Sequence, residues 1–141
     1  MTRSRIRIFY HFVWATKNRE LLLDAQHERA AHRLIEALAI EKKCVVRALN
    51  GMPDHVHLVV QAPATISASE LMHHTKGVSS SGLNETEFPL HNFGWQEGYG
   101  VFSLSQRDLK EVISYVENQK AHHAENKLKP SLEDPNEEVA R

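Results

Sequence analysis

Apolar residues in this 141-residue chain recur at period two in some segments and at helical spacing in others. The order of these segments constrains the fold more than any other feature. Residues 5–16 alternate between apolar and more polar side chains. This period of two, with aromatic and β-branched residues, predicts a strand. Asp24 precedes apolar residues at helical spacing to about Lys42, which predicts a helix capped by that aspartate. The same reasoning predicts strands at 44–50, 55–62 and 99–104, and helices at 67–78 and 105–126.

This β-α-β-β-α-β order, followed by one more helix, predicts an α+β fold of ferredoxin-like type. The expected sheet is four-stranded and antiparallel, with helices on one face and an added C-terminal helix that carries a tyrosine. Ser67 and Ser105 each stand three residues before an acidic residue, a spacing typical of a capped helix start. Residues 79–86 are rich in serine and glycine and are expected to form a polar loop.

Composition and charge exclude a few classes of protein. Hydrophobic residues make up 41% and charged residues 25%, which is ordinary for one globular domain, expected at residues 1–128. Residues 129–141 are acidic and expected to form a loose tail. No run of about 18 apolar residues occurs, so we expect no membrane span, and the first residues lack a secretory signal pattern.

The single cysteine and the distribution of charge bear on compartment and partners. Cys44 cannot form an internal disulfide, which favours a reducing cytoplasm. The net charge of -1 neither favours nor excludes a nucleic-acid partner. Basic residues gather near the start and acidic residues near the end, which fits either a local basic surface or an ordinary mixture of solvated charges.

Two histidines begin the predicted strand at residues 55–62. Residues two apart on a strand point to one face, so His55 and His57 project together while Val56 and Leu58 take the other. Two neighbouring imidazoles on a strand suit a divalent metal ion. The chain has 10 histidines, so the pair also fits a chance arrangement without metal.

The last predicted helix carries a tyrosine and a glutamine four residues apart. At about 100° per residue, Tyr115, Gln119 and His122 share one face beside an apolar stripe. We expect Tyr115 at the polar margin of that stripe, where its phenol could meet a substrate. The spacing also fits a tyrosine that only packs at a boundary and a glutamine that only favours helix.

Three segments, taken in order, resemble the single-tyrosine HUH transposases of IS200/IS605-type elements, including the REP-associated tyrosine transposases. They are YHFVWATK at 10–17, MPDHVHLVV at 52–60 and YVENQ at 115–119. The similarity runs from about residue 5 to residue 126, and Gly98–Ser103 and the pair His122-His123 add to it. Three motifs in the right order are more specific than any one of them.

The resemblance implies an activity and a set of residues that carry it. His55, His57 and Gln119 would bind Mg²⁺ or Mn²⁺, and Tyr115 would attack single-stranded DNA and become attached to its 5′ phosphate. A phenol with a pKa of about 10 is a tolerable leaving group, so a second 3′ hydroxyl can reverse the attachment without ATP. Hairpin-containing DNA and a homodimer, in which the tyrosine helix serves the partner's histidines, are further implications.

Candidate contacts with DNA phosphates are Lys17, Arg19 and Lys76. After Lys76, where relatives often carry more basic residues, this chain has the sequence VSSSG at 78–82. Two other functions stay open on sequence grounds. One is a regulator that binds hairpin DNA without cleaving it, and the other is a metal-dependent hydrolase that activates water.

Overall fold

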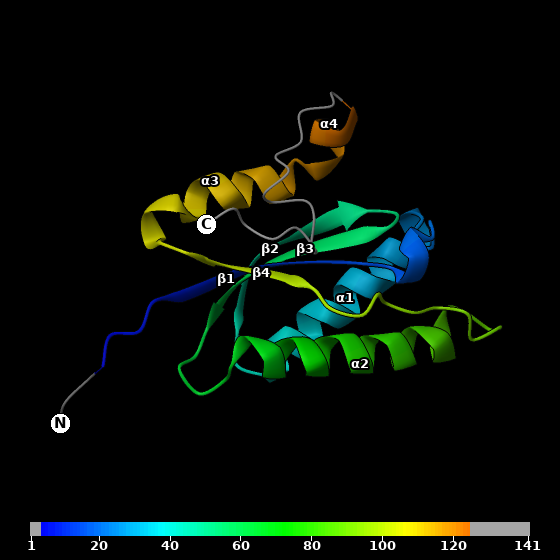
Figure 1. Ribbon diagram of the computed structural model, residues 1–141, viewed down its shortest axis with the longest axis horizontal. Helices are drawn as coiled ribbons and strands as arrows, with labels where there is room; N and C mark the ends of the chain where they lie inside the picture. The colour runs from blue at the N-terminus through cyan, green and yellow to red at the C-terminus, as the bar shows by residue number, and fades with distance from the viewer. Residues whose placement is uncertain (1–3, 125–141) are drawn as a thin grey trace.

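Four strands form one antiparallel sheet in the order β2-β3-β1-β4 (Figure 1). They are β1 (Ile8–Ala15), β2 (Val45–Met52), β3 (His55–Ala62) and β4 (Gly100–Leu104). The structure, a computed structural model, describes residues 4–124, so the predicted acidic tail lies outside it. The strand order and connectivity confirm the predicted ferredoxin-like α+β fold.

Helices cover both faces of the sheet (Figure 1). The helices α1 (Ala25–Glu41) and α2 (Ala68–Thr86) lie on one face, as predicted for the βαββαβ unit. The added helix α3 (Gln106–Glu117) lies on the opposite face and is followed by the short helix α4 (Gln119–Ala124). In the described part of the chain, no helix combines the length and the apolar character needed to cross a membrane.

The period-two pattern of the strands sorts their side chains into two separate cores. On β1, Phe12 and Trp14 are buried in the core that α1 and α2 cover. Phe9 of β1 and Val59 of β3 are buried in the second core, under α3. Because successive side chains on a strand point to opposite faces, each strand contributes to both cores.

The predicted helix starts are confirmed by hydrogen bonds at their first turns. The side chain of Asp24 accepts from the backbone N–H of His27 at 2.9 Å. The hydroxyl of Ser67 accepts from the N–H of Glu70 at 3.1 Å, and that of Ser105 from the N–H of Asp108 at 3.2 Å. Each cap satisfies an N–H that has no partner within its own helix.

The helix α2 continues through residues 79–86, so the prediction of a polar loop there was wrong. Ser79 is buried, and its hydroxyl accepts a hydrogen bond from the indole N–H of Trp95 at 2.9 Å. Gly82 lies so close to α1 that a Cβ atom would come within 2.9 Å of the Leu34 side chain. Ser79 and Gly82 lie where Trp95 and α1 pack closely against α2, and this segment does not end the helix.

The predicted single helix at 105–126 is in fact two helices, with a break at Asn118. Asn118 has φ -100° and ψ 23°, and its side-chain amide donates to the carbonyl of Ser114 at 2.8 Å. The amide of Asn50 on β2 donates to the carbonyl of Glu117 at 3.0 Å. Side-chain donors thus bind carbonyl groups at the end of α3, and this favours helix termination.

Lys120 attaches α4 to the rest of the domain. Its ammonium group donates to the Glu28 carboxylate on α1 at 2.9 Å, to the Asn50 side chain at 3.0 Å and to the Gly51 carbonyl at 3.2 Å. Asn50 therefore contacts both the end of α3 and the start of α4. This arrangement holds the end of α3 and the start of α4 against the end of β2.

Replacement of Gly51 and of Gly77 by alanine should have opposite effects on the free energy of unfolding. A Cβ at Gly51 would collide with the backbone carbonyl of His55 on the paired strand, whereas a Cβ at Gly77 in α2 meets no atom within 4 Å. We expect Gly51→Ala to lower the free energy of unfolding by about 1–3 kcal/mol. Gly77→Ala should raise it by about 0.5–1 kcal/mol because alanine favours helix. Urea unfolding of both variants measures this, and equal effects would contradict the packing described.

Removal of the Lys120 contacts should loosen α4 while α3 stays in place. An ion pair at this level of exposure contributes about 0.3–1 kcal/mol, so Lys120→Met should speed amide exchange in α4 about two- to fivefold. Lys110→Met, on an exposed position of α3, is the matched control. Hydrogen exchange followed by mass spectrometry reports both helices, and unchanged exchange in α4 would show that Lys120 does not hold it.

Candidate active site

The histidine pair begins β3 and projects from the sheet face that α3 covers. His55 and His57 are buried, with 3% and 0% of their surface exposed. Val56 and Leu58 point into the other core, as the alternation of the strand predicts. The rings of His55 and His57 lie 5.2 Å apart, centroid to centroid, at an angle of 72°.

The ends of α3 and α4 bring the predicted tyrosine and glutamine to this pair. The ring of Tyr115 lies edge-on to His57, with 6.3 Å between the ring centroids. The side-chain oxygen of Gln119 lies 3.4 Å from Nε2 of His55, and Gln119 is fully buried. All four side chains that the sequence singled out therefore meet in one place, and all belong to the same chain.

The position predicted for Tyr115 on its helix was wrong. We expected it at the polar margin of the apolar stripe, but only 3% of its surface is exposed. It is buried along the same side of α3 as Val112 and Val116, which pack on the sheet. The prediction failed because the face of the sheet beneath Tyr115 presents imidazoles, so a phenol there can face inward.

A third histidine joins the group. Nε2 of His123 on α4 lies 3.1 Å from the side-chain oxygen of Gln119, and its ring lies 5.2 Å from that of His55. The sequence marked His123 only through the resemblance and instead grouped His122 with Tyr115. The break at Asn118 changes which residues after it face the sheet, and the side chain of His122 lies outside what the structure describes.

Each imidazole of the pair has a neighbour at Nδ1. Nδ1 of His55 lies 2.8 Å from a carboxylate oxygen of Asp54, and Nδ1 of His57 lies 2.9 Å from Nε2 of the buried His11 on β1. Sequence reasoning assigned no role to His11 or to Asp54. Alternation along β1 puts His11 on the same strand face as Val13, but the pairing of Val13 with His57 depends on strand register, which the sequence pattern does not specify.

Asp54 places a carboxylate beside the histidine pair. The hydrogen bond from His55 lowers the pKa of Asp54 below its ordinary value, and the nearby Arg19 guanidinium lowers it further. One carboxylate oxygen faces His55, and the other lies 3.5 Å from the Arg19 guanidinium. Asp54 is thus a carboxylate held between two positively polarised groups.

The donor atoms fit a hard or borderline divalent cation. Two imidazole nitrogens and one amide oxygen suit Mn²⁺ well and Mg²⁺ acceptably. Within residues 4–124, His, Cys, Asp and Glu side chains alone form no group of three that could hold a metal ion. A metal ion bound here would therefore need the amide oxygen of Gln119 together with the two histidines.

The three basic residues predicted to contact DNA occupy two different regions. Lys17 and Arg19 lie in the turn after β1, whose last residue, Ala15, pairs with His55. They are exposed at the same end of the sheet as the histidine pair. Lys76 lies on α2, on the far face of the sheet, so the structure does not bring it to the cluster.

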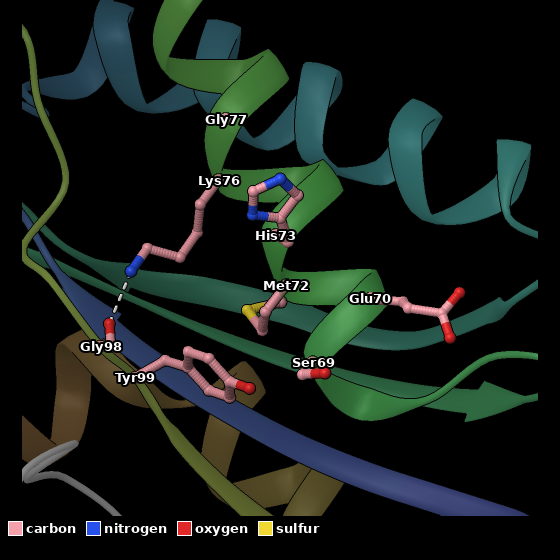
Figure 2. A pocket seen from close by; sticks show the side chains of 8 residues that line it. All are labelled: Ser69, Glu70, Met72, His73, Lys76, Gly77, Gly98 and Tyr99. Carbon is pink, nitrogen blue, oxygen red and sulfur yellow. Dashed lines mark hydrogen bonds between the residues drawn. The ribbon is translucent and has the colours of Figure 1, made fainter.

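Lys76 instead borders a cavity of about 590 Å³ between α2 and the segment before β4 (Figure 2). Its ammonium donates to the carbonyls of Gln96 and Gly98 at 2.8 and 2.6 Å and lies over the Tyr99 ring. Burial lowers the pKa of Lys76. These contacts tie α2 to the chain entering β4, which is a structural role that the sequence did not predict.

Comparison with known proteins points to the same transposase family that the sequence motifs resemble. Residues 4–119 match the model of the family described as "Transposase IS200 like". The transposase for insertion sequence element IS200 of Salmonella typhimurium is 27% identical over 124 residues, covering 84% of this chain and 81% of that protein. The ISDra2 transposase TnpA of Deinococcus radiodurans is 24% identical over 115 residues, covering 78% of this chain and 82% of its own length.

Solved structures share the fold. A candidate transposase from Deinococcus radiodurans R1 superposes with a TM-score of 0.67 at 25% identity, covering 84% of this chain and 98% of that chain. A REP-associated tyrosine transposase bound to a REP hairpin superposes with a TM-score of 0.66 at 16% identity, covering 87% of this chain and 74% of that chain. The match of the family model includes the whole sheet and all four clustered side chains, so this chain belongs to the IS200-like transposase family.

Proposed function

We propose that this transposase cuts and rejoins single-stranded DNA through a covalent bond between Tyr115 and a 5′ phosphate. His55, His57 and Gln119 would hold a Mg²⁺ or Mn²⁺ ion beside the tyrosine. The observation that carries the proposal is the meeting of Tyr115 and Gln119 with the histidine pair in one buried cluster. Family membership supports it, because transposition requires breaking and joining DNA strands.

The chemistry of the cluster suits phosphoryl transfer. When bound, the ion would supply positive charge to the non-bridging phosphate oxygens and offset charge that develops on phosphorus. The burial of the imidazoles and the amide strengthens such electrostatic effects, since little water screens them. Tyr115 contributes an oxygen that attacks phosphorus and later departs from it.

The proposed reaction is balanced without an outside energy source. The Tyr115 oxygen forms a bond to phosphorus as the bond from phosphorus to the 3′ oxygen breaks. The phenol gives up one proton, and the released 3′ oxygen takes up one to become a hydroxyl. A new 3′ hydroxyl reverses both changes, so the phosphodiester is regenerated and the phenol is restored.

DNA would reach the cluster from the end of the sheet where the turn after β1 lies. The exposed side chains of Lys17 and Arg19 stand there, next to His55, and suit binding of the phosphate backbone. The structural neighbour that is bound to a REP hairpin favours a hairpin as the DNA partner. For Lys76, whose ammonium donates to two backbone carbonyls, we propose only a weak DNA contact.

A covalent adduct with DNA tests the proposal directly. We expect single-stranded hairpin oligonucleotides from the DNA flanking the coding sequence, labelled at the 3′ end, to become attached to the protein with Mn²⁺. The adduct should disappear in Tyr115→Phe and after removal of metal by EDTA. Tyr10→Phe, which removes a phenol oxygen from the opposite face of β1, is the matched control and should keep full activity.

The same assay separates the two alternatives. A hydrolase would still cleave the DNA in Tyr115→Phe, and its products would carry no protein. A regulator would bind the hairpin without cleaving it, even in the wild-type protein. Either result would exclude the tyrosine mechanism.

Mixed variants test whether one chain holds a complete site. All four side chains of the cluster come from the same chain, so we expect a mixture of His57→Ala and Tyr115→Phe proteins to form no adduct. The homodimer that the family resemblance implies stays a prediction, to be measured by analytical ultracentrifugation. Recovery of activity in the mixture would mean that two subunits exchange their tyrosine helices.

A further inference from the structure

Each imidazole of the histidine pair is held at its Nδ1 atom. Nδ1 of His55 contacts Asp54 at 2.8 Å, and Nδ1 of His57 contacts His11 at 2.9 Å. Nε2 of His55 faces the Gln119 oxygen instead. His55 therefore faces Gln119 with one ring nitrogen and Asp54 with the other, and His57 contacts His11 through Nδ1.

We propose that Asp54 and His11 are positioning residues that fix the tautomer and orientation of His55 and His57 for metal binding. The inference rests on the metal site of the proposed function. A neutral imidazole carries one hydrogen, and only its bare nitrogen can bind a metal ion. Whatever holds the hydrogen on Nδ1 therefore leaves Nε2 ready as the ligand atom.

Asp54 enforces this arrangement on His55 by charge. An ionised carboxylate can only accept hydrogen bonds, so Nδ1 of His55 must carry the hydrogen. Asp54 is itself anchored, because its backbone carbonyl accepts from the N–H of Thr16 at 2.9 Å and its second carboxylate oxygen faces Arg19. The carboxylate lies on the Nδ1 side of His55, opposite Nε2, so the geometry favours a positioning residue over a ligand.

His11 holds His57 by position in the sheet. It lies on β1, pairs with Val59, and is fully buried, with its ring stacked on that of His57 at 5.1 Å and 22°. An imidazole can donate or accept, so this contact permits two tautomer arrangements. Only the one in which His57 donates from Nδ1 to Nε2 of His11 leaves Nε2 of His57 bare for a metal ion.

Mn²⁺ binding in the absence of DNA tests the inference. We expect Asp54→Asn and His11→Phe each to weaken Mn²⁺ binding, followed by electron paramagnetic resonance, by about 10- to 100-fold. His11→Gln should recover most of the affinity, because its amide oxygen can accept near the place of Nε2. Asp24→Asn, which keeps a helix cap, and His73→Asn, on an exposed position of α2, are the controls and should bind as the wild type does.

The outcomes separate this inference from the proposed function. If His57→Ala and Gln119→Ala leave Mn²⁺ affinity unchanged, the metal site itself is wrong. If those two variants lose affinity while Asp54→Asn and His11→Phe stay within about twofold of wild type, only the positioning roles are wrong. Loss in one of the two positioning variants alone would overturn the role of the other residue.

A measurement on the unaltered protein tests the proposal even if the variants fail to fold. Long-range ¹H–¹⁵N spectra of the metal-free protein, at mildly alkaline pH, report which ring nitrogen carries hydrogen. We expect the hydrogen on Nδ1 in both His55 and His57. Hydrogen on Nε2 of either ring would overturn the proposal for its partner.

Discussion

Burial of β3 on both faces is the constraint on which the site depends. This strand pairs with β1 on one side and β2 on the other, so its backbone groups are engaged along its length. One face carries Val56 and Leu58, while the other begins with two imidazoles. Buried polar rings need hydrogen-bonding partners, and here the adjacent strand, the preceding turn and the C-terminal helices provide them.

The break between α3 and α4 decides how those helices meet the strand. On one continuous helix, residues four apart would lie above one another on the same face. In the structure α3 ends at Glu117, and α4 sets off in a different direction (Figure 1). Tyr115 can then pack against His57 while Gln119 reaches His55 from beyond the break. The break at Asn118 therefore helps to set the positions of both Tyr115 and Gln119.

Local patterns gave most of the fold, and long-range contacts account for what they missed. The bounds of the strand at 55–62 and the capped helix starts follow from periodicity and hydrogen bonding within a few residues. Residues 79–86 were predicted to form a loop because they are rich in serine and glycine. In the structure Gly82 packs against α1 and Ser79 binds Trp95, and both partners are distant in sequence. The four principal site residues were predicted from order and resemblance. The contact of His11 was missed because it depends on strand register.

The sheet separates two cores, and this has a consequence for how such a chain can diverge. Side chains such as Phe12 and Leu71 pack only on the α1 and α2 side, with the whole sheet between them and the imidazoles. Val112 and Val116 pack on the α3 side, on the same helix that carries Tyr115. Substitutions in the first core should therefore act mainly on stability, whereas substitutions in the second would also shift Tyr115, the proposed nucleophile. The two halves of one small domain should therefore accumulate substitutions at different rates.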